Sequence, residues 1–271
     1  MTTKLIPILI DRSRRRLSSQ LALDLTCAVL LVGFSAMAQS NAANLAQVKL
    51  SNTDLPGFSV IYEGDRDWAL FTLESGAPAE CLKGQPIING REQVWKRNAT
   101  EAKKTDGRLR VDYAVFDTPG QAASAARAAA LLINNATERM EGNETIGDAS
   151  WRTIAGSSSL IVANANAVFY VSAQGDSNTS EGDLAQIAQK LVLKANTLST
   201  KLSFDQFACD VDVYAGLNLI SPKVARQISQ GATRRRPVED LKSLINSETG
   251  KGIQREAAVN LLRSLSAMSA K

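Results

Sequence analysis

The sequence contains no histidine, and this absence excludes more chemistry than any other feature of its composition. Without an imidazole there is no Ser-His-Asp or Cys-His catalysis, no HExxH zinc site and no histidine phosphoacceptor. Aromatic residues make up only 5% of the chain while alanine is abundant, so we expect a core built mainly of Ala, Val, Leu and Ile. The length of 271 residues leaves room for one or two domains.

The amino terminus has the layout of an export signal. A basic run at Arg12–Arg16 precedes a largely apolar stretch, and Ala36–Ala38 places small residues where a signal peptidase cleaves. The alternative is an uncleaved anchor, but the apolar run is short of the roughly 20 residues that span a bilayer. The sequence therefore predicts a cleaved signal over 1–38 and a periplasmic or secreted protein, with the choice between Sec and Tat export left open.

Cysteine is scarce as well. Removing the signal leaves two cysteines, Cys81 and Cys209. An isolated pair in an oxidising compartment is most simply a disulfide, which would close a long loop and stabilise the fold by ~4 to 5 kcal/mol if unstrained. Two buried free thiols are the alternative, and the sequence leaves both open.

Charge is divided unevenly along the chain. The net charge is +4, but residues 39–220 carry −5, while the chain from Ser221 onward has ten Lys and Arg against four Asp and Glu. The uneven charge indicates an acidic body followed by a basic tail. We expect an α+β domain over 39–212 and a basic helical tail over 213–271.

The strongest secondary-structure signals lie between residues 108 and 196. Residues 108–115 alternate between apolar and polar side chains, which predicts a half-buried strand. Thr118–Gln121 then supplies an N-cap, a proline and a glutamine at the start of an alanine-rich helix. Leu160–Ala163 and Val168–Val171 flank Asn164–Asn166, which predicts a hairpin whose turn uses the tolerance of asparagine for positive φ. Another helix follows, with apolar residues at helical spacing at Leu184, Ile187, Ala188, Leu191 and Ala195.

Two β-like runs precede this block, at 58–62 and 68–73, and Glu63–Asp67 between them reads as a charged hairpin turn. Residues 92–103 fit either a short exposed helix or an extended segment. The order β-β, then β-α-β-β-α, predicts an α+β protein with an antiparallel sheet and helices packed on one face. The strand order does not follow from the sequence.

The tail predicts helices only. Ser221 and Pro222 begin a short helix, and the segments 237–245 and 253–265 form a small C-terminal helical hairpin. Such a unit cannot bury its apolar face alone, so it should dock on the body, on a partner or on another copy.

Arg234, Arg235 and Arg236 are the candidate binding residues. Adjacent guanidinium groups can bind phosphate or carboxylate bidentately, although a solvated charge run is the simpler interpretation. No aromatic residue interleaves with the arginines, and an exported protein does not favour nucleic acid as a partner. The expected partner is a protein or an anionic envelope component reached through the tail, and membrane contact is expected only through the signal before cleavage.

Three other patterns invite a site and have simpler explanations. Glu63, Asp65 and Asp67 offer oxygen ligands for Ca²⁺, but they lack the spacing of an EF-hand and suit a charged turn. Ser157–Ser159 has no histidine and no SxxK lysine to activate a nucleophile. The run Gly250–Gly252 is too short for a phosphate loop and fits a helix-helix turn. We predict no metal site and no cofactor.

The aspartates around Cys209 support the alternative of an enzyme. Asp205, Asp210 and Asp212 include an Asp-x-Asp pair, and opposed carboxylates serve as acid and base in glycosidases. On a strand, that pair would point to one face and be solvated. The preferred hypothesis is thus a non-enzymatic binding or scaffolding protein of the cell envelope, with no catalytic residue assigned. A carboxylate-based envelope hydrolase and a regulatory module acting through the helical tail remain the alternatives.

Overall fold

The computed structural model describes one compact unit that begins at Asn44. The described residues are 44–67, 81, 89–98, 107–132, 138–139, 146–153, 159–174, 181–198 and 202–269. The predicted signal over 1–38 and the predicted strand at 68–73 lie outside these residues.

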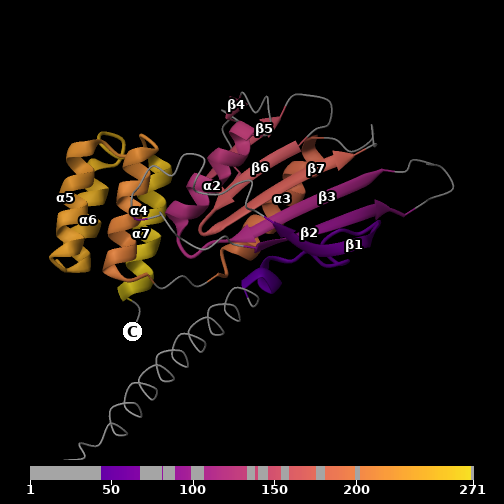
Figure 1. Cartoon of the computed structure of the whole chain (residues 1–271), viewed down its shortest axis with the longest axis horizontal. Helices are drawn as coiled ribbons and strands as arrows, with labels where there is room; N and C mark the ends of the chain where they lie inside the picture. Colours follow the sequence, from indigo (N-terminus) through magenta and orange to yellow (C-terminus); the bar gives the residue numbers. More distant parts are fainter. Residues whose placement is uncertain are drawn as a thin grey trace, which may run out of the picture. The chain divides into compact units, whose positions relative to one another are not determined.

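A single antiparallel sheet of seven strands organises the first part of this unit (Figure 1). The expectation of an α+β protein with an antiparallel sheet is confirmed. In spatial order the strands are β1 (Phe58–Asp67), β2 (Asn89–Arg97), β3 (Arg108–Val115), β7 (Ala167–Gln174), β6 (Ser159–Asn164), β5 (Ala149–Thr153) and β4 (Glu138–Arg139).

Two helices cover the sheet, and they lie on opposite faces rather than on the one face expected. The alanines of α2 (Pro119–Leu132) pack with Ala114 and Val168, whereas the apolar side chains of α3 (Glu181–Ala195) pack with Val111 and Phe169. Neighbouring strand residues point to opposite faces, so these contacts require a helix on each side. Both faces are filled at β6, where all six residues are buried. The sheet with α2 and α3, residues 44–198, is called the body below.

The predicted turn at Glu63–Asp67 is wrong. These residues continue β1 and pair with β2 in register, from Glu63 opposite Gln93 to Asp67 opposite Asn89. A bulge at Ile61 shifts the register between Val60 and Tyr62. The charged residues that follow stay in the strand because β1 lies at the edge of the sheet, where their side chains reach solvent. The open choice for residues 92–103 is settled for β2, which is extended to Arg97.

The hairpin of β6 and β7 is confirmed, with one change in its turn. Ala165 rather than an asparagine takes the left-handed conformation, at φ 51°. Its backbone N–H donates to Asp148 Oδ2 at 2.6 Å, and Asn166 Nδ2 donates to the Phe116 carbonyl oxygen at 2.7 Å. The asparagine therefore serves as a hydrogen-bond donor, and the buried aspartate contact holds the strained alanine.

The chain before β1 joins the core. Leu45, Val48 and Leu50 are buried beside the sheet. The Gln93 side-chain amide binds both backbone groups of Leu50, accepting from its N–H at 3.2 Å and donating to its carbonyl oxygen at 3.1 Å. This amide replaces a strand partner for Leu50 and fixes the segment on the sheet.

Four helices complete the unit, one more than the short helix and the helical hairpin that were expected. They are α4 (Phe204–Gly216), α5 (Pro222–Thr233), α6 (Val238–Glu248) and α7 (Arg255–Ser269), and together they form the helical layer (Figure 1). The layer has its own apolar core, centred on Phe207, Ile228 and Leu261. The expected boundary after Asp212 falls inside α4, because Ser203 and Gln206 form a capping box that starts this helix earlier. No helix in the described ranges is both long and apolar enough to cross a membrane.

Candidate binding surface

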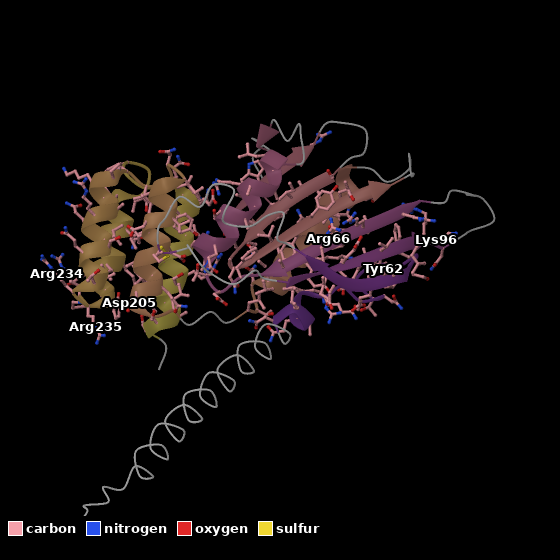
Figure 2. All side chains as sticks on the ribbon, in the orientation of Figure 1. Tyr62, Arg66, Lys96, Asp205, Arg234 and Arg235 are labelled. Carbon is pink, nitrogen blue, oxygen red and sulfur yellow. A yellow bond between two sulfur atoms is a disulfide. The ribbon has the colours of Figure 1, made fainter. Side chains whose placement is uncertain are left out.

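The three predicted arginines lie at the corner between α5 and α6, and all three are exposed (Figure 2). Arg234 caps the C-terminus of α5, the Arg235 N–H donates to the Ala232 carbonyl, and the Arg236 N–H donates to the Gly231 carbonyl. These two bonds are those of a Schellman motif, which satisfies the last carbonyls of a helix. The backbone of the corner is therefore fixed while its guanidinium groups remain in solvent.

Two further cations extend this corner along α5. Lys223 and Arg226 are exposed on the helix that ends at the arginines, and residues 222–236 contain no Asp or Glu. The resulting set of five cations is called the α5 basic surface: Lys223, Arg226, Arg234, Arg235 and Arg236. None of the five has an ion-pair partner within the part of the chain that the structure describes. Sequence reasoning missed the first two, although the absence of acidic residues from this stretch was a readable signal.

Acidic side chains near the α5 basic surface have partners of their own. Asp212 accepts a hydrogen bond from Ser229 Oγ at 3.0 Å, and Glu239 pairs with Lys242 at 2.9 Å. The first contact places the Asp212 carboxylate against Ser229 of α5, and the second holds Glu239 on α6. The cations of α5 consequently keep their charge available for an external anion.

The backbone of Arg235 is in an unusual state. Three helices of the layer are followed by a residue with positive φ: Asn218 at 59° after α4, Arg235 at 52° after α5 and Gly250 at 79° after α6. Glycine and asparagine adopt this conformation at low cost, whereas a residue such as arginine pays about 1 kcal/mol. Of these three left-handed positions, only the one after α5 holds a residue that is poorly suited to the conformation, and that residue is Arg235.

The aspartates considered for acid-base catalysis lie on a helix, not on a strand. In α4, Asp205 and Asp212 are exposed and Asp210 is buried. Residues two apart on a helix point to opposite sides, so Asp210 and Asp212 do not converge. Figure 2 shows Asp205 at the exposed end of α4. The geometry does not form the opposed carboxylate pair that a glycosidase requires.

Asp210 instead joins the helical layer to the body. Its Oδ1 accepts from Thr118 Oγ1 at 2.5 Å and from the Gly120 N–H at the start of α2, while Oδ2 has no partner in the described structure. A Cβ on residue 120 would lie 2.3 Å from Oδ1, so this close approach requires glycine. Burial raises the pKa of Asp210 to about 7, against the lowering effect of the two hydrogen bonds.

Two ion pairs continue this junction. Arg127 on α2 binds Glu256 on α7 bidentately, at 3.0 and 2.8 Å, and its guanidinium lies over the Trp151 ring at 5.2 Å. Arg263 on α7 binds Asp148 at 3.0 Å. The Glu256 side chain is only 2% exposed, and the Arg127 guanidinium compensates this buried carboxylate. These contacts dock α4 and α7 on the body. Of the three docking surfaces considered for the tail, the structure therefore shows the body.

The predicted disulfide is present. Cys81 and Cys209 are bonded, with their Cα atoms 5.9 Å apart. Cys209 lies on α4 beside Asp210, so the covalent link and the buried carboxyl anchor the same helix. A disulfide is consistent with an oxidising compartment.

The other predicted sites receive structural explanations. Glu63 pairs at 2.7 Å with Lys49 in the segment before β1, and Asp65 pairs at 3.2 Å with Arg91 on β2, so cations neutralise two of the three acids considered for Ca²⁺. Ser159 begins β6 and is buried, while 157 and 158 lie outside the described residues. Gly250 adopts positive φ in the turn between α6 and α7, as expected for a helix-helix link.

A second charged region lies on the sheet face that also carries α2, toward β1. Asp112 is nearly fully buried and accepts two bonds from Arg110, at 3.0 and 2.8 Å, while Arg110 also meets Glu92 at 3.0 Å. Arg66 approaches Asp112 at 3.6 Å (Figure 2). Burial raises the pKa of Asp112, and the Arg110 contacts oppose this shift. These charges neutralise one another and form a strand-spanning network rather than an open site.

On the opposite face, a groove of about 530 Å³ lies between the segment before β1 and the strands β1 and β2. Lys49, Glu63 and Trp95 contribute to its lining. The Trp95 Nε1 is buried without an acceptor in the described structure, and Val60, which also lines the groove, is partly exposed. Polar and apolar groups mix here without indicating one ligand chemistry.

Comparisons with known proteins add no assignment: no family model, no curated protein and no solved structure matches the chain.

Proposed function

We propose that the protein is an exported, non-enzymatic binding protein of the cell envelope that engages an anionic partner through the α5 basic surface. The observation that carries the proposal is the set of five exposed cations without ion-pair partners among the described residues, on a stretch that lacks acidic side chains. Charges left unpaired on a rigid helix remain free to bind an external anion, whereas paired charges have already satisfied one another.

Export is supported by two independent features. The first 38 residues have the layout of a cleaved signal, and the Cys81–Cys209 bond fits a periplasmic or extracellular location, where disulfides persist. A binding role is supported further by the chain's lack of histidine and by the fixed structural duties of its buried carboxyls, Asp210 and Glu256.

Co-sedimentation with isolated bacterial envelopes tests the proposal. The mature chain, beginning after Ala38, is mixed with envelopes across a series of salt concentrations. The wild type should sediment at low salt and be released as salt screens the contact. The variant with R234E, R235E and R236E together should stay in the supernatant at every salt concentration.

R108E provides a matched control, because Arg108 is an exposed cation on β3 of the body. This variant should sediment like the wild type. Equal sedimentation of the triple variant and the wild type would overturn the proposal, as would the absence of any salt-sensitive sedimentation by the wild type.

A further inference from the structure

We infer that the ligand of the α5 basic surface is the anionic phospholipid headgroup, and that the helical layer adsorbs to a bilayer through this surface without inserting. The inference rests on the proposed function, names the class of its partner and replaces the expectation that the membrane is contacted only through the signal before cleavage. It is carried by the placement of α5 in the layer, by the side chains that α5 presents to solvent and by the backbone of Arg235.

Within the helical layer, α5 lies apart from the contacts that dock the layer on the body. The body is held through α4 and α7, by way of Asp210, Glu256 and Arg263. The contacts of α5 are with α4 and α6, and its exposed side carries Lys223 and Arg226 (Figure 1). A helix of 12 residues is about 18 Å long, so α5 and its arginine corner form an extended cationic track rather than a point site.

The chemistry of this track suits phosphate diesters. Arginine presents a planar fork of donors that matches two phosphate oxygens, and Lys223 adds a compact charge. Gln227 and Gln230 are also exposed along α5 and supply further donors. A surface with an excess of cations attracts anionic headgroups and offers neutral headgroups no net charge interaction.

Adsorption without insertion follows from the burial of the apolar residues of α5. The apolar side chains of α5 are buried in the core of the helical layer: Val224, Ala225, Ile228 and Ala232. None of them remains to enter a lipid layer, which separates this surface from an amphipathic membrane helix. Residues 222–236 also contain no aromatic side chain on which nucleic-acid bases would stack.

The charge of the rest of the chain orients this contact. Residues 39–220 carry −5, whereas the chain from Ser221 carries +6. An anionic bilayer repels the first region and attracts the second, so the approach is directed through the helical layer. The side chain of Arg235 adds to this attraction from a left-handed position where glycine would be more stable.

Vesicle flotation provides the test, with the full mature chain and two vesicle types. One type holds phosphatidylglycerol and phosphatidylcholine in equal parts, and the other holds phosphatidylcholine alone. The wild type should float with the first and not with the second, and added salt should release it. Each basic residue contributes about 1 kcal/mol at an anionic surface, so R235G should weaken partitioning about fivefold.

Two variants separate charge from folding. N218G changes the equivalent left-handed residue of α4 without changing charge, and it should float like the wild type. R235G replaces a strained arginine by glycine and should be at least as stable as the wild type, so its weaker binding cannot arise from unfolding. Flotation of R235G equal to that of wild type, or equal flotation of the wild type with both vesicle types, would overturn the inference.

Binding to soluble polyphosphate distinguishes a failure of the lipid inference from a failure of the proposed function. Binding of polyphosphate through the same arginines, together with no flotation on phosphatidylglycerol vesicles, would reject the lipid and leave an anionic partner in place. If the wild type binds neither polyphosphate nor phosphatidylglycerol vesicles, the lipid inference and the proposed function both fail.

Discussion

The body and the helical layer treat their charges in opposite ways. In the body, strand cations meet strand carboxylates, as Arg110 does with Asp112 and Glu92. On α5 and the corner that follows it, five cations face solvent with no described ion-pair partner. Paired charges support a fold and unpaired charges of one sign attract a ligand, and this difference is the basis for the proposed binding through the layer.

The two regions also differ in how they hold strained backbone. The left-handed Ala165 of the body donates its N–H to Asp148, an aspartate that also binds Arg263 of the helical layer. The left-handed Arg235 keeps its side chain in solvent, and the backbone bonds of the α5 corner support it. Strain in the body is therefore held by a structural contact, whereas strain in the layer accompanies an exposed charge.

The largest expected effect concerns the covalent link between the two regions. Replacing Cys81 and Cys209 by serine removes a cross-link between residues separated by 128 positions. By the chain-entropy model the free energy of unfolding should fall by about 4 to 5 kcal/mol. Denaturant unfolding of the variant and of the reduced wild type measures the loss. An unchanged midpoint would show that the bond does not stabilise the junction.

The buried ion pair should be almost as costly to break. E256Q leaves Arg127 without its compensating charge, and removing one partner of such a pair costs about 3 to 5 kcal/mol. E239Q is the matched control, because Glu239 lies exposed on α6 with Lys242 as its partner. The control should change stability by less than about 0.5 kcal/mol. Similar losses in both variants would mean that the junction does not depend on the Arg127–Glu256 contact.

Asp210 makes the stability of the junction depend on pH. Its folded-state pKa of about 7 lies above the ordinary value of 3.8, so the folded state binds the proton more tightly than the unfolded chain. The contribution is complete below pH 3.8 and is lost as pH rises through 7, by up to about 4 kcal/mol. D210N does not titrate, so the stability of the wild type relative to D210N should fall between pH 4 and 8. A constant difference across this range would contradict the assignment.

The smallest effect compares the ends of α4 and α5. R235G should raise the free energy of unfolding by about 0.5 to 1 kcal/mol, because glycine relieves the left-handed strain. N218G should change it by only a few tenths of a kcal/mol, since asparagine already tolerates this conformation. Thermal unfolding of both variants beside the wild type measures the contrast. Destabilisation by R235G would show that the arginine side chain supports the fold.

Local signals carried much of this fold. The alternation in β3, the start of α2 at Pro119 and the β6–β7 hairpin are all predictable, because each depends on neighbouring residues. The placement of α2 and α3 on opposite faces is not, since it depends on which residues of strands far apart in sequence become neighbours. The charged run at Glu63–Asp67 was mistaken for a turn for a related reason, because the cation that pairs with Asp65 lies on the partner strand β2.

The arginines at the corner of the candidate site were predictable from the sequence, whereas its cations along α5 were not. Arg234–Arg236 stand out as adjacent charges, whereas Lys223 and Arg226 join them only once α5 places all five on one solvent-facing element. The role of Asp210 was hidden because its partners, Thr118 and Gly120, lie about ninety residues earlier in the chain.

The central claim is that binding belongs to the helical layer and not to the body. Amide hydrogen exchange of the mature protein, with and without phosphatidylglycerol-containing vesicles, tests it most directly. Exchange should become slower within residues 222–236 on vesicle binding, with β1, β2 and β3 unchanged. Protection that appears on those strands while α5 exchanges as before would contradict it.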